Sequence, residues 1–87
     1  MKFNPDVFGN VPARDSANAA MAVIDALQSF RPEVQLAGLA SAFKLAAERV
    51  GIRPTDAFTV SGNLMNDVEG RRPEFAAVAE YMKQEWK

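Results

Sequence analysis

Three Arg-Pro pairs divide the chain into helical segments. They are Arg31-Pro32, Arg53-Pro54 and Arg72-Pro73. The residue before a proline avoids helical geometry, whereas proline fits the first helical position, where its missing N–H is not needed. Each pair therefore predicts that one helix ends and the next begins. The pairs lie 22 and 19 residues apart, and nothing beyond them aligns, which favours convergence on one start signal over an internal repeat.

Apolar side chains recur at helical spacing after each start, and no segment after residue 13 alternates with the period of a strand. We therefore predict an all-α fold, a compact bundle of about four helices. The expected helices run from Asp15 or Ser16 to the break at 31–32, over 32–50, over 54–70, and from 72 almost to the end of the chain.

The second of these segments carries the clearest signals. Glu33 complements the positive end of the helix dipole, and Gly51 stands where a left-handed cap belongs. A line of small residues (Gly38, Ala42 and Ala46) would let another helix approach closely. The expected core joins this helix to the first one through Leu27, Phe30, Leu36, Leu39, Phe43 and Val50.

The third segment is a weaker helix former. Residues 59–62 (Thr-Val-Ser-Gly) predict a kink or a shortened helix, because glycine alone costs up to about 1 kcal/mol relative to alanine in a helix. With Ala47 and Gly51 four residues apart, followed by Ile52, the region resembles a helix-turn-helix. That motif would make the chain a nucleic-acid-binding regulator, with candidate contacts at Arg49, Arg53, Asn63 and Asn66.

The charges of that region argue against nucleic acid as the partner. Residues 55–70 hold no lysine or arginine and three acids, Asp56, Asp67 and Glu69. A helix that enters the major groove needs basic residues around it for the phosphates. We therefore expect this region to be a corner between two helices that serves packing within the fold and does not bind DNA.

Residues 1–13 form an extended N-terminal arm in this interpretation, and residues 14–87 form the helical domain. Turn-forming pairs punctuate the arm, yet Phe3, Val7, Phe8 and Val11 are apolar. The arm therefore covers either the core of its own chain or the surface of a second subunit or partner.

Composition excludes several kinds of chemistry. The 87 residues hold ten basic and eleven acidic side chains, with no cysteine and no histidine. Thiolate metal sites and the usual general base are therefore missing. The segment 66–70 (Asn-Asp-Val-Glu-Gly) lacks the ligand alternation of a calcium loop. We expect a protein that is not an enzyme and has no cofactor or metal. With no targeting signal or apolar run of membrane length, we also expect it to be soluble, cytoplasmic and free of the membrane.

An interaction surface is the remaining kind of site. Trp86 ends the apolar stripe of the last helix, where it either staples the last turn to the core or anchors an interface. Interfaces favour such side chains. The candidate protein interface consists of Arg71, Arg72, Tyr81, Met82 and Trp86. Because fifteen alanines add little buried area, we expect a homodimer with Met82 and Trp86 near the contact.

The stretches "RPEVQLAGLASAFKLAAERVGI" and "GRRPEFAAVAEYM" resemble the small helical proteins encoded by bacteriophages. That resemblance implies a small protein that binds a host or phage macromolecule as an inhibitor or regulator. The sequence therefore predicts a non-catalytic helical protein-interaction module.

Overall fold

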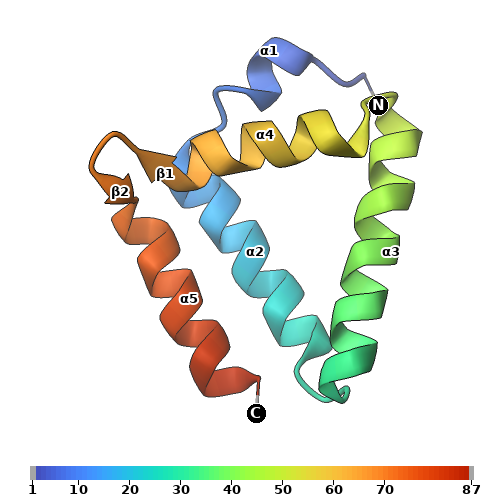
Figure 1. The fold of residues 1–87 in the computed structure, drawn as a ribbon, viewed down its shortest axis with the longest axis vertical. Helices are drawn as coiled ribbons and strands as arrows, with labels where there is room; N and C mark the ends of the chain where they lie inside the picture. The colour runs from blue at the N-terminus through green and yellow to red at the C-terminus, as the bar shows by residue number, and fades with distance from the viewer. Residues whose placement is uncertain (1, 87) are drawn as a thin grey trace.

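The computed structural model describes residues 2–86, and Figure 1 shows the arrangement of its helices. Its elements are α1 (Pro5–Phe8), α2 (Ala13–Leu27), α3 (Pro32–Val50), α4 (Pro54–Met65), β1 (Asn66–Asp67), β2 (Gly70–Arg71) and α5 (Pro73–Glu85). The predicted all-α class is confirmed, since two-residue strands are the only sheet within residues 2–86.

The start and stop signals act as the sequence predicted. Pro32, Pro54 and Pro73 are the first residues of α3, α4 and α5. Gly51 ends α3 with a φ of 82°, and its N–H donates to the carbonyl oxygens of Ala47 and Glu48. Only glycine reaches this left-handed conformation at little cost, so the chain turns sharply from α3 into α4.

The limits of α2 differ from those expected. The helix starts at Ala13, with Pro12 at its N-cap, so Asp15 lies in the first turn and is not the cap. It ends at Leu27, and the following residues form tighter turns, in which the N–H groups of Gln28 and Phe30 donate to the carbonyl oxygens of Asp25 and Leu27. Phe30 therefore lies outside the helix with half of its side chain exposed.

Of the two outcomes predicted for the third segment, a kink or a shortened helix, the structure has the shortened helix. α4 runs unbroken through Gly62 and ends at Met65. The chain then forms a small antiparallel hairpin that the sequence did not predict. The Asp67 carboxylate accepts from the N–H of Glu69 at 2.8 Å, and Gly70 takes a φ of 121°, so local turn chemistry explains the hairpin.

The core lies between α2 and α5, which run side by side (Figure 1). Its buried members are Ala17 and Ile24 from α2 and Phe75 and Val78 from α5. The stripe predicted for the last helix is therefore its buried face, and Ile24 is the largest fully buried side chain among the described residues.

The predicted core on α3 requires correction. Leu36 is 67% exposed, and Leu39, Phe43 and Val50 are only half-buried, as is Leu27 of α2. α3 packs on the rest of the fold mainly near its two ends (Figure 1). At one end the Gln35 Nε2 donates to the carbonyl oxygen of Leu27 at 3.0 Å, and at the other α3 meets α4.

The corner between α3 and α4 carries the N-terminal arm. Ala47 and Ala57 are both buried there, since their small side chains allow the two helices to approach. The arm is not extended throughout, because Asn4 caps the single turn of α1 by accepting from two backbone N–H groups. Its Phe3 and Phe8 rings lie 5.5 Å apart and face the corner, so the arm packs on its own chain.

We expect Ile24→Ala to lower the free energy of unfolding by about 2–5 kcal/mol, because it empties the centre of the core. Leu45→Ala is the matched control, since Leu45 is 65% exposed and its truncation should change stability by no more than about 0.5 kcal/mol. Urea denaturation followed by circular dichroism measures both. Equal losses would contradict the assignment of the core to α2 and α5.

Candidate functional site

The aromatic end of α5 is engaged with α2. Trp86 donates from its indole Nε1 to the carbonyl oxygen of Ile24 at 3.0 Å. Tyr81 donates its phenolic O–H to the carboxylate of Asp25. Tyr81, Met82 and Trp86 pack against the core. Trp86 therefore has the stapling role, one of the two that the sequence left open.

The five residues of the predicted interface do not form one patch. Arg71 ends β2 and Arg72 is the N-cap of α5, whereas Tyr81, Met82 and Trp86 lie at the other end of that helix. At 1.5 Å per residue, Tyr81 lies about 13 Å and Trp86 about 21 Å along α5 from Arg72. A partner would meet the arginines and the aromatic cluster as separate surfaces.

The bond between Tyr81 and Asp25 changes the acidity of the phenol. The hydrogen bond to the carboxylate raises the pKa of Tyr81 from 10.0 to about 12, with smaller contributions from burial and from the charges of Asp25 and Glu85. Ionisation would break the bond and place two negative charges side by side. The contact between α2 and α5 is therefore strongest while the phenol is neutral.

The candidate nucleic-acid contacts are also dispersed. Arg53 is paired with Asp56, from Nε to Oδ2 at 2.9 Å and from Nη2 to Oδ1 at 3.3 Å, and this contact raises the pKa of the arginine. Asn66 donates its amide to the carbonyl oxygen of Gly62 at 3.1 Å, while Asn63 is exposed on α4 and Arg49 lies in the last turn of α3.

The four arginines that could contact phosphates do not lie on one surface. Arg49 and Arg53 flank the start of α4, whereas Arg71 and Arg72 follow the hairpin beyond its other end (Figure 1). The 12 residues of α4 span about 18 Å. The helix between the two pairs carries Asp56 and no basic side chain, so the corner lacks a continuous cationic face.

The larger exposed surface lies on α3. At about 100° per residue, apolar side chains occupy about two thirds of the circumference of this helix. Yet Gln35 and Ala47 are its only buried residues. Among its large apolar side chains, Val34, Leu36 and Leu45 are 39%, 67% and 65% exposed. The apolar face of a helix is normally packed against another element, so this exposure is unusual for a chain on its own.

Leu36 and Leu45 lie on opposite sides of α3. They are nine residues apart, which corresponds to a rotation of about 180° around the helix axis. Their exposure is nearly equal. The sequence indicated an apolar surface here, because these leucines flank the small residues Gly38, Ala42 and Ala46. It could not show that the leucines stay uncovered by the other helices of the described chain.

The total surface of the chain is large for its mass. It exposes 6578 Å² at 9.5 kDa, whereas a folded monomer of that mass typically exposes about 5,000 Å². The excess of about 1,500 Å² is comparable to what one subunit contributes to an obligate interface, roughly 1,000–2,500 Å² per partner. The chain therefore exposes more total surface than a compact monomer of its mass, and the exposed apolar side chains of α3 contribute to that surface.

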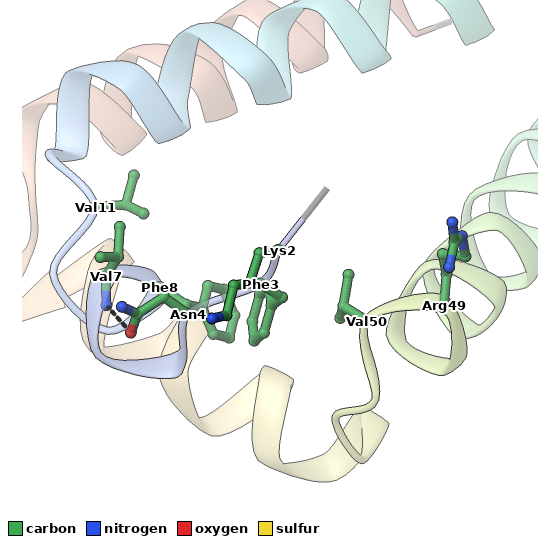
Figure 2. A pocket seen from close by; sticks show the side chains of 8 residues that line it. All are labelled: Lys2, Phe3, Asn4, Val7, Phe8, Val11, Arg49 and Val50. Atoms are coloured by element: carbon green, nitrogen blue, oxygen red, sulfur yellow. Dashed lines mark hydrogen bonds between the residues drawn. The ribbon is translucent and has the colours of Figure 1, made fainter.

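Two hollows are lined in part by other residues of α3. A groove of about 300 Å³ opens between α3 and the α2–α5 pair, with Leu39 on one wall and Ile24, Met82 and Trp86 on the other. A second pocket, of about 470 Å³, lies between the arm and the end of α3. Figure 2 shows the Phe3 and Phe8 rings at its base and Val50 and Arg49 across the opening from Val7 and Val11.

The arm pocket is a shallow site with few polar groups. Lys2 and Arg49 are its charged residues, and both are exposed. Residues 2–86 contain no group of three or more acidic side chains that could hold a metal ion. In the same part of the chain, no helix combines the length and the apolar character needed to cross a membrane.

Comparisons with known protein families, with curated proteins and with solved structures find no match to this chain. The surface of α3 is therefore interpreted from its own geometry and chemistry.

Tyr81 should titrate near pH 12 in the folded protein. Because the folded pKa lies above the ordinary value of 10.0, the bond to Asp25 stabilises the fold fully below pH 10 and is lost as the pH rises toward 12. Tyr81 is the only tyrosine, so its phenolate absorbance can be followed directly. Asp25→Asn should return the midpoint toward 10, and an unchanged midpoint in that variant would contradict the assigned cause.

We expect duplex DNA to bind no more tightly than the weak non-specific range, roughly 10⁻⁴–10⁻⁶ M at physiological salt. The dispersed arginines and the Arg53–Asp56 pair are the reason. Fluorescence anisotropy with a labelled duplex measures this affinity. Nanomolar, salt-sensitive binding that disappears in Arg53→Ala would instead establish the helix-turn-helix function.

Proposed function

We propose that this chain is a non-catalytic protein-interaction module whose binding element is α3. The observation that carries the proposal is the exposure of Val34, Leu36 and Leu45 on a helix that is apolar around most of its circumference. Burying these side chains against a partner would recover the hydrophobic free energy that the fold alone leaves unrealised, at roughly 25 cal/mol per Å².

The arrangement of the other surfaces supports α3 as the element that binds. The polar atoms of Trp86 and Tyr81 are already hydrogen-bonded to α2. The arm already covers the corner at Ala47 and Ala57. α3 keeps Leu39 and Phe43 half-buried but leaves Leu36 and Leu45 exposed to solvent. A helix offered in this way suits recognition in which apolar side chains enter a partner's groove.

A module of this kind acts by occupancy. It changes the activity of its partner by covering a surface, so it requires no catalytic group, cofactor or metal of its own. The resemblance to small bacteriophage proteins fits such an inhibitor or regulator. Its exposed leucines are predicted to set affinity, since residues at the centre of an interface carry most of the binding free energy.

Site-specific photo-crosslinking tests the proposal. A photoreactive amino acid is placed at Leu36 or at Leu45, and cells that express each variant are irradiated. We expect a discrete protein adduct from at least one of these positions, because the two leucines lie on opposite sides of α3 and a partner that binds this helix must cover at least one of them. The matched control is position Glu80, exposed on α5, which should give no adduct. Equal labelling at all three positions, or none at any, would contradict the proposed function.

A further inference from the structure

One side of α3 carries an acid at one end, a base at the other and apolar residues between them. These residues are Glu33, Leu36, Ala37, Ala40 and Lys44, which we call the α3 stripe. Leu36 and Ala37 are each three or four residues from Glu33 and Ala40, and all five residues fall within an arc of about 100° on one side of the helix. All five are exposed.

The charges of the α3 stripe have no ion-pair partner among the described residues. Within residues 2–86 the ion pair is Arg53–Asp56. Glu33 and Lys44 are eleven residues apart, or about 16 Å along the helix, which is too far for them to pair with each other. A complementary partner must therefore present a base and an acid at the same separation and in the opposite order.

The α3 stripe itself has that pattern when it is turned end to end. We propose that a second copy of the chain packs on it, with the two α3 helices antiparallel about a two-fold axis between Ala37 and Ala40. Glu33 then lies beside the partner's Lys44, and Lys44 lies beside the partner's Glu33. A two-fold contact must be self-complementary, and this arrangement satisfies both charges at once.

The side chains at the centre suit a close contact between helices. Ala37 and Ala40 would let the axes approach to about 8 Å, the lower end of the usual range. Leu36 would then lie over the alanines of the other copy and leave solvent.

This inference rests on the proposed function, because it names the partner of one side of the proposed binding helix. It also replaces the dimer expected from the sequence, in which Met82 and Trp86 formed the contact. Those side chains pack on α2 of their own chain. Leu45, on the opposite side of α3, stays outside this dimer contact and provides the control.

Sedimentation equilibrium on the purified full chain gives the first test. We expect the parent to form a dimer and Leu36→Gln to weaken its association at least about tenfold, as for a central contact residue. Leu45→Gln should associate like the parent. A parent that stays at 9.5 kDa up to high micromolar concentration would overturn the proposal, and so would a dimer that only Leu45→Gln disrupts.

Charge reversal gives the second test. Glu33→Lys alone and Lys44→Glu alone each place like charges together at both ends of the contact, so each should weaken self-association about tenfold or more. The double variant should restore it to within about threefold. Mixing the two single variants should yield a heterodimer, because one chain then carries two bases and the other two acids. Variants that all associate like the parent would reject the antiparallel pairing.

The two proposals fail in different ways. Thermal unfolding of each variant, followed by circular dichroism, checks that the monomer still folds, and the mixing experiment needs both variants to be folded. If the purified chain is a monomer but position 36 or 45 crosslinks to another protein in cells, the second copy is the wrong partner and the interaction module stands. If the chain forms no dimer and neither position gives an adduct, both proposals are wrong.

Discussion

The packing of α2 against α5 is the contact on which the rest of the structure depends. It contains four of the buried apolar residues, and the two side-chain hydrogen bonds from Tyr81 and Trp86 join the same pair of helices. α3 and α4 add the small contact at Ala47 and Ala57. The fold therefore concentrates its stability in one helix pair and holds α3 out from it.

That distribution explains why α3 is the candidate binding element. The buried Gln35 amide anchors one end of α3 to α2 through the Leu27 carbonyl oxygen, and the glycine cap and α4 fix the other. A helix fixed near both ends loses little conformational freedom when a partner covers its middle. Such preorganisation lowers the cost of binding, which suits a module that acts by occupying a surface.

Local signals made the helices predictable. Pro32, Pro54 and Pro73 set three helix starts and Gly51 set one end, because each acts through backbone geometry within a few residues. The exceptions were also local. The hairpin after α4 depends on the Asp67 side chain and on Gly70. These residues form a turn, and its strands of two residues are too short to show an alternating apolar pattern.

The pairing of apolar faces could not be predicted in the same way. The stripes containing Ile24 and Phe75 were both visible in the sequence, as was that of Leu36 and Phe43. No local sequence pattern indicates that the stripes of Ile24 and Phe75 pack together across about 50 residues. None indicates that the stripe of Leu36 and Phe43 stays partly exposed. The candidate site was missed for this reason: the sequence directed attention to Trp86, a large side chain, whereas the site follows from which helix has no neighbour.

The bonds from Tyr81 and Trp86 give the chain a built-in optical reporter. Each is the only residue of its type, and each reaches α2 across 56 or 62 residues. Intrinsic fluorescence therefore reports chiefly on the docking of α5 on α2 and is much less sensitive to the far side of α3. A ligand that covers Leu45 can leave the emission spectrum nearly unchanged, whereas one that separates α5 from α2 will shift it toward the red.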